Sequence, residues 1–205
     1  MMMSHIKIVR IPILPMYMVN AHLIVGPDGC ILVDAGVPGS EHKIERALAK
    51  ERLTFKDIKL IVVTHAHVDH AGSAAVLREK SGAPILAHEG DAKHFSRETP
   101  MTFCPTGWVS RLFIKTPFIF QPYVPFEADI QVTRQSVISL DRYGIPGKIR
   151  HTPGHTAGSI SVELESNQAL VGDLVASGIL LGGLSEPHVR YVRLLKMTLT
   201  WLRVN

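Results

Sequence analysis

The sequence HAHVDH at residues 65–70 places three imidazoles and a carboxylate within one short polar segment. Neutral imidazole nitrogen and carboxylate oxygen are ligands for zinc, and a catalytic zinc site keeps one position open for water or substrate. In an extended loop the side chains of His65 and His67 project to the same side, so both can bind one ion. Asp69 and His70 are displaced along the chain, towards a second ion. The segment therefore predicts a metal site with spacing suited to two metals.

The alternative is that these are surface histidines and that Asp69 only caps a helix. We disfavour it because so dense a cluster rarely arises by chance, although a motif still needs its structural context.

Two later segments supply further candidate ligands. His155 lies in TPGHTAGS between two predicted strands, where Gly154 and Gly158 allow a sharp backbone course that could aim the imidazole at the first cluster. Asp173 follows an apolar run at residues 169–171. Taken alone, the first segment more often marks a turn and the aspartate a turn cap. Together with residues 65–70, both become candidate metal ligands.

The elements that must position these residues alternate between strands and helices. A short apolar run is typical of a strand buried on both faces, and two such runs joined by a Gly-Pro-Asp-Gly turn predict a hairpin. The predicted strands are residues 6–14, 21–25, 30–33, 58–63, 85–87, 137–140, 148–151, 159–164 and 169–171. Predicted helices begin after the N-cap Ser40, cover residues 71–80 and cover residues 188–204. The β-α-β-α-β alternation indicates a layered α/β fold.

Residues 91–128 differ from the rest because they hold eight of the thirteen aromatic residues, interleaved with prolines. We predict a lid-like insertion that forms an apolar substrate pocket, with Phe103, Trp108 and Phe113 as candidate pocket residues. The alternative is that these aromatics fill the core or a dimer contact, since large aromatics dominate both settings.

In this order, THAHVDHAG, TPGHTAGS and VGD, preceded by LVDAG at residues 32–36, resemble the metallo-β-lactamase superfamily over nearly the whole chain. The resemblance implies an α/β (α+β) fold, a four-layer αβ/βα sandwich with a dinuclear site on one edge. It also implies two zinc ions, with manganese or iron as alternatives. The implied ligands are His65, His67 and His155 for the first metal, Asp69 and His70 for the second, and Asp173 as a bridge between them.

One feature of the family is absent from the 205 residues. Members usually supply another histidine to the second metal from a Pro-Gly-His-Gly or Met-Gly-His-Gly segment. His188 precedes the predicted terminal helix and is interpreted as a surface residue. We therefore expect a C-terminally shortened sandwich whose second metal site is weak, completed by water or empty. An exposed sheet edge or apolar surface would then favour a homodimer or lower stability.

The resemblance implies hydrolysis of a small-molecule substrate. Water between two divalent ions loses its proton near neutral pH and attacks a carbonyl or phosphoryl centre, and Asp69 would orient it or pass a proton to the leaving group. True β-lactamases generally carry Cys or Ser where Asp173 stands, so the aspartate favours an ester, thioester or lactone, as in glyoxalase II and lactonases. The alternatives are a non-catalytic metal-binding sensor or interaction protein on the same fold and, third, a phosphodiesterase or nuclease.

Composition bounds these predictions. A chain of 205 residues is the size of one domain. The net charge of +4 comes without a run of Lys or Arg, which argues against nucleic acid as a partner. The sequence has two cysteines, Cys30 and Cys104, and their number and spacing do not indicate a disulfide-rich fold. The first residues lack a secretory signal and no apolar run approaches the length of a membrane span, so we expect a cytoplasmic protein without a membrane partner.

Overall fold

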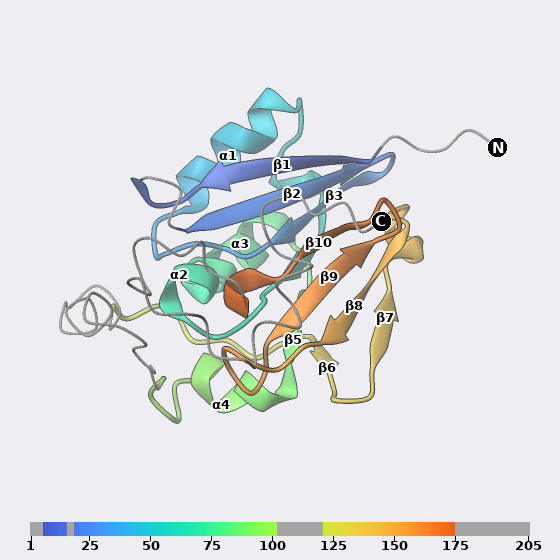
Figure 1. Ribbon diagram of the computed structural model, residues 1–205. Helices are drawn as coiled ribbons and strands as arrows, with labels where there is room; N and C mark the ends of the chain where they lie inside the picture. The colour runs from blue at the N-terminus through green and yellow to red at the C-terminus, as the bar shows by residue number, and fades with distance from the viewer. Residues whose placement is uncertain (1–5, 16–18, 102–120, 175–205) are drawn as a thin grey trace, which may run out of the picture.

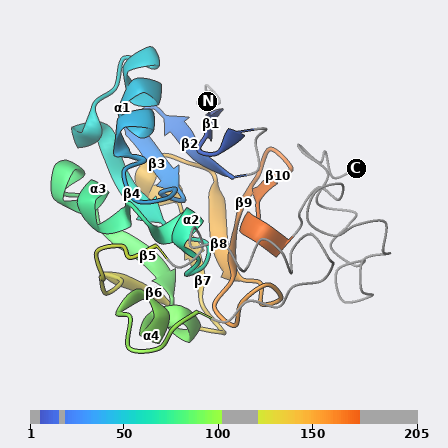
Figure 2. The same ribbon diagram turned by 90° about the vertical axis from the view of Figure 1, so that its left-hand side faces the viewer.

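The computed structural model describes residues 6–15, 19–101 and 121–174, and the structural statements below concern these residues. They form two β-sheets that face each other, and the helices cover the outer side of the larger sheet (Figures 1 and 2). The helices are α1 (Glu41–Lys50), α2 (Val68–Ala71), α3 (Ala74–Ser81) and α4 (Ala92–Phe95).

The larger sheet has six strands in the order β1-β2-β3-β4-β5-β6. The first three strands are antiparallel neighbours, and β3 to β6 run parallel to one another. Because parallel strands end at the same edge, the loops after β3, β4 and β5 lie together. The strands are β1 (Lys7–Pro12), β2 (Asn20–Gly26), β3 (Gly29–Val33), β4 (Ile58–Val62), β5 (Ile85–His88) and β6 (Ile130–Val132).

The smaller sheet is antiparallel, with the strand order β10-β9-β8-β7. Since β8 and β10 both pair with β9 in the antiparallel sense, β8 and β10 run in the same direction, and their C-terminal ends lie at the same edge of the sheet. The strands are β7 (Val137–Ser139), β8 (Gly147–His151), β9 (Ile160–Leu164) and β10 (Gln168–Leu170).

Two apolar layers hold this arrangement together, and β3 contributes to both. Its residues Cys30 and Leu32 pack on the helix side with Ile44 of α1. Ile31 and Val33 point to the opposite face and pack between the two sheets. Burial on both faces explains why the central parallel strands appear in the sequence as continuous apolar runs. The described residues thus confirm the predicted α+β sandwich, and the helix predicted at residues 188–204 lies outside them.

Two local predictions hold in outline and differ from the structure in detail. Helix α1 begins after Ser40, but the Ser40 side chain makes no capping hydrogen bond because its backbone is already helical (φ −75°, ψ −9°). The helix predicted over residues 71–80 is present as α3 (Ala74–Ser81) but begins three residues later, because α2 and α3 are separated at Gly72 and Ser73. There the Ser73 hydroxyl donates to the Val37 carbonyl (2.7 Å) and accepts the Ser40 N–H (3.0 Å), which ties the break to the loop before α1.

The ends of the aromatic segment belong to the core. Phe95 and Phe126 are buried, their ring centroids lie 4.9 Å apart, and both pack in the layer between the larger sheet and its helices. These two residues therefore pack as the core interpretation expects. The candidate pocket residues Phe103, Trp108 and Phe113 lie outside the described residues. Within the described ranges, no helix is long and apolar enough to cross a membrane.

Candidate metal centre

The candidate ligands come from both sheets and meet at one edge of the sandwich. His65 to His70 follow β4, His155 lies in the loop between β8 and β9, and Asp173 follows β10. The Ile160 N–H of β9 donates to the Thr64 carbonyl (3.0 Å), which joins the two sheets beside the site.

Gly172, the residue before Asp173, has a left-handed backbone (φ +55°), and a Cβ atom there would lie 2.6 Å from Thr64 Oγ1. A glycine at this position therefore lets the turn that carries Asp173 approach the end of β4.

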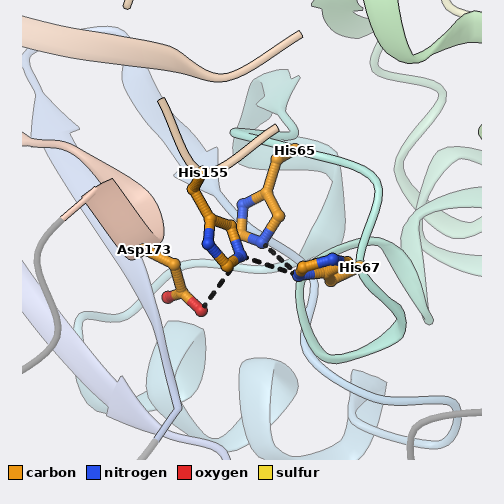
Figure 3. Close-up of side chains that lie close together, drawn as sticks. All are labelled: His65, His67, His155 and Asp173. Carbon is orange, nitrogen blue, oxygen red and sulfur yellow. Dashed lines mark hydrogen bonds and ion pairs between the residues drawn. The ribbon is translucent and has the colours of Figure 1, made fainter. Parts of the chain in front are cut away.

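Three histidine nitrogens converge in the first group of ligands (Figure 3). His67 Nδ1 lies 3.1 Å from His65 Nε2 and 2.8 Å from His155 Nε2. A neutral imidazole nitrogen carries either one proton or one lone pair in the ring plane, so three such nitrogens cannot each pair with the other two. One cation can accept a lone pair from all three. A tetrahedral ion about 2.05 Å from its donors keeps ligand atoms about 3.3 Å apart, close to these spacings.

Asp173 adds an oxygen to this group and belongs to a second group as well. Its Oδ2 lies 3.7 Å from His155 Nε2, and its Oδ1 lies 3.2 Å from His70 Nε2. Asp69 Oδ2 lies 3.8 Å from the same His70 nitrogen. Within each group the ligand atoms lie within 4.8 Å of one another. The six predicted ligands therefore lie together, in two groups that share Asp173 and that could each hold a metal ion.

Asp34 orients two of the histidines. Its Oδ2 lies 2.8 Å from His70 Nδ1 and accepts the Thr64 hydroxyl (3.0 Å). Since the Thr64 hydroxyl donates to Asp34, it can accept a proton from His65 Nδ1, which lies 3.1 Å away. Both arrangements leave the Nε2 atoms of His65 and His70 directed at the ligand groups. Such outer partners fix the tautomer of a metal-binding imidazole.

The charges of the site separate its histidines into two kinds. Burial lowers the pKa values of His65 and His155, and the positive charge of His70 acts in the same direction on both. Burial opposes protonation of His70 too, but the carboxylates of Asp173, Asp34 and Asp69 raise its pKa well above the ordinary value. His65 and His155 therefore present neutral nitrogens near pH 7, whereas His70 holds a proton between carboxylates.

The two aspartates that face His70 also differ. Burial works against ionisation of Asp173, but His70 outweighs it and lowers the pKa of Asp173 far below the usual range. Burial raises the pKa of Asp69, and repulsion from Asp173 adds to this effect against the attraction of His70. Asp173 is therefore an anionic candidate ligand, and Asp69 is the carboxyl group better suited to carry a proton.

The sequence interpretation gave no role to two buried carboxylates beside the site, Asp34 and Asp91. Asp34 stood within LVDAG at the end of a strand, and its left-handed backbone (φ +63°) is unusual for a residue other than glycine. Asp91 accepts hydrogen bonds from both histidine loops. In the sequence, the one feature that could have pointed to Asp91 is its position shortly after a buried strand.

Comparison with known proteins defines the class of protein. The family model described as the metallo-β-lactamase superfamily matches residues 14–193. The probable metallo-hydrolase MJ0888 of Methanocaldococcus jannaschii is 32% identical over 162 residues, which cover 78% of this chain and 68% of that protein. The hydroxyacylglutathione hydrolase GloC of Haemophilus influenzae is 27% identical over 142 residues, covering 69% of this chain and 60% of that protein.

A solved structure, a HARLDQ-motif metallo-β-lactamase mutant of Cronobacter sakazakii, superposes with a TM-score of 0.57 at 27% identity. The match covers 75% of this chain and 55% of that one, so the chain spans about half the length of the solved structure. The chain belongs to the metallo-β-lactamase superfamily, and its fold and candidate metal-binding residues are consistent with a metallo-hydrolase.

Proposed function

We propose that the chain is a zinc-dependent hydrolase with a dinuclear centre, acting on an ester, thioester or lactone. The observation that carries the proposal is the convergence of His65, His67 and His155, from loops on two different sheets, around one point beside Asp173. Packing alone does not require three imidazole nitrogens to converge on one point, whereas binding of one cation by all three does.

The donor set favours zinc in the first group. Imidazole suits zinc, and carboxylate oxygens suit zinc, manganese and magnesium. The first group offers three imidazoles and one carboxylate, and the second offers one imidazole and two carboxylates. Bound in such a centre, divalent ions would generate hydroxide from water near neutral pH and would polarise the electrophilic carbonyl.

The chain's own residues then have separate tasks. His65, His67 and His155 would hold the first ion through their ring nitrogens, and Asp173 spans both groups with its two oxygens. Asp69 lies beside the second group, with a side chain that is 23% exposed. Its raised pKa and its access to solvent suit it to take a proton from water and hand it to the leaving group.

The substrate class rests on two supports. The relative from H. influenzae is named as a hydrolase of hydroxyacylglutathione, so an acylated glutathione is the first substrate to test. An anionic carboxylate at Asp173 supports the same choice, as the sequence interpretation argued. The names of the structural neighbours make a β-lactam the necessary comparison substrate.

The experiment measures zinc per chain and initial rates on a panel of acylated glutathione, aryl ester, lactone, cephalosporin and bis-aryl phosphodiester. We expect hydrolysis of at least one of the first three, lost with a chelator and restored with zinc. Stoichiometric zinc with no turnover of any substrate would instead support the non-catalytic metal-binding protein. Faster turnover of the cephalosporin or the phosphodiester would overturn the substrate class while keeping the metal centre.

A further inference from the structure

Asp91 connects the two histidine loops through hydrogen bonds. It follows β5, its side chain is buried, and it makes no capping bond to the helix α4 that starts after it. Its Oδ2 accepts the Ala66 N–H (3.0 Å) and the Thr156 hydroxyl (2.8 Å), and its Oδ1 accepts the Gly158 N–H (2.8 Å). A carboxylate without a cation beside it would be costly to bury, so these three donors are what keep it there.

The three donors lie in the two loops that carry the candidate histidine ligands. Ala66 lies between the candidate ligands His65 and His67, and Thr156 directly follows the candidate ligand His155. The two loops are separated by about ninety residues in the chain, as the 88-residue gap between His67 and His155 shows. Asp91 belongs to neither loop. Its carboxylate is thus a third element that fixes the distance between the two halves of the nitrogen-rich group.

Close packing around Asp91 supports this reading. A Cβ atom on Gly158 would lie 2.6 Å from Asp91 Cγ and 2.7 Å from its backbone nitrogen, so no larger residue allows the same approach. Just before Asp91, the ring of His88 stacks on His151 with centroids 3.8 Å apart, and His151 Nε2 donates to the Ala157 carbonyl (2.8 Å). The end of β5 and the loop after it therefore contact the end of β8 and residues 156–158 of the loop that follows β8.

We propose that Asp91 is a positioning residue that preorganises the His65, His67 and His155 nitrogens for one metal ion. The proposal rests on the metal centre of the proposed function and adds how that centre is assembled. Ligands held in place before the ion arrives bind it more tightly, and loss of an outer partner typically weakens metal affinity about 10- to 100-fold.

The first test is Asp91→Asn, which keeps the shape but replaces one oxygen with a donor group. Whichever way the amide turns, it presents N–H groups to Gly158 or to Ala66, so at least one hydrogen bond is lost. We expect zinc affinity at the first group to fall by about 10- to 100-fold, measured by competition with a chromophoric chelator. In the metal-free protein, the Ala66 and Gly158 amides should exchange with deuterium faster than in the parent.

A second pair of variants avoids dependence on one substitution. Thr156→Val removes the hydroxyl that donates to Asp91 at nearly constant size, and Thr156→Ser retains it. We expect weaker zinc binding and faster Gly158 exchange in the valine variant only. This pair decides the question if Asp91→Asn does not fold.

Two controls separate positioning from loss of stability. Asp57→Asn alters another carboxylate that accepts a backbone N–H, that of Thr54 (2.8 Å), before β4 and so at the opposite end of that strand from the site. Leu48→Ala lowers the melting temperature through a core residue of α1. Neither should change zinc affinity.

Parental zinc affinity and parental amide exchange in Asp91→Asn and Thr156→Val would overturn the proposal. So would an equal loss of affinity in Leu48→Ala. If the parent binds no zinc, the proposed function fails, and the exchange comparison in the metal-free chain still decides whether Asp91 holds the loops together.

Discussion

The two groups of candidate ligands share Asp173 but present opposite kinds of charge to a metal. The first is made of three imidazoles from both sheets, and burial keeps the pKa values of His65 and His155 low. The second is rich in carboxylate, and those carboxylates raise the pKa of His70. Since a metal binds only the deprotonated imidazole, an ion must displace a proton from His70 but none from His65 or His155. We therefore expect the first group to bind the first equivalent of zinc.

The difference also separates holding an ion from moving a proton. The first group's histidines His65 and His67 are almost entirely buried, at 1% and 5% exposure, whereas Asp69 reaches solvent. A single anionic residue, Asp173, connects the two environments. Each prediction below acts on one side of this comparison.

The largest effect is expected from His67→Ala, which removes the nitrogen that faces both His65 and His155. Zinc affinity of the first group should fall by more than about 100-fold, which is the upper end of the range for loss of a residue that only contacts a ligand. Hydrolysis should fall to the rate of the metal-free protein. The measurements are zinc stoichiometry and kcat/KM. The matched control is His42→Ala, an exposed histidine of α1. Parental zinc content in His67→Ala would show that the first group does not hold the ion.

Asp69→Asn should act on the second group alone. The amide cannot carry the proton, so we expect kcat to fall about 10²- to 10⁴-fold, the range for loss of a general acid or base. At a free zinc concentration that just fills both groups of the parent, zinc bound per chain should drop from two to one, because the first group does not contain Asp69. Loss of both ions would contradict the division into two groups. Asp173→Asn, which touches both, provides the contrasting variant.

Much of the fold follows from local patterns, and its departures come from distant contacts. The apolar runs of β3, β4 and β5 are visible in the sequence because both faces of each strand are buried. The break between α2 and α3 is not visible, because the Ser73 hydroxyl that accompanies it bonds to Val37, 36 residues earlier. A local pattern of helix-forming residues contains no information about such a partner.

The site divides in the same way. Four candidate ligands stand out in the sequence because they lie within six residues: His65, His67, Asp69 and His70. His155 and Asp173 became candidates only together with that cluster, and the role of all six in binding metal stays a prediction. Asp34 and Asp91 do not stand out, because an aspartate after a strand is commonly a turn residue. Their partners are 30 residues away for Thr64 and 67 residues away for Gly158. Only the folded chain shows that these carboxylates are buried against the histidine loops.

Asp34→Asn should weaken the second group more than the first. Asp34 contacts His70 directly but reaches His65 only through the Thr64 hydroxyl. We expect about 10- to 100-fold weaker binding of the second zinc equivalent and a smaller change for the first. Stepwise titration of the metal-free protein measures both affinities in one experiment. Equal losses at the two steps would mean that Asp34 supports the end of β4 as a whole rather than His70.

The smallest effect concerns His22 of β2, whose pKa senses Asp34 and His70. Burial lowers the pKa of His22 to about 4, with the charges of Arg10 and His70 acting in the same direction and Asp34 acting against them. The unfolded chain takes up this proton near pH 6.5, so between pH 6.5 and 4 the unfolded state binds more protons and stability falls as the pH falls.

Replacing His22 with glutamine should remove this loss. From pH 7.5 to 5.5 the parent should lose about 1 kcal/mol of unfolding free energy relative to His22→Gln. Urea denaturation of both metal-free proteins at three pH values measures the difference. If the difference in unfolding free energy between the two proteins does not change with pH, His22 takes up a proton as readily in the folded chain as in the unfolded chain. Protonated His22 would then lie near His70 at mildly acidic pH and would lower the pKa of His70. The difference in pKa between His70 and the histidines of the first group would then be smaller than expected.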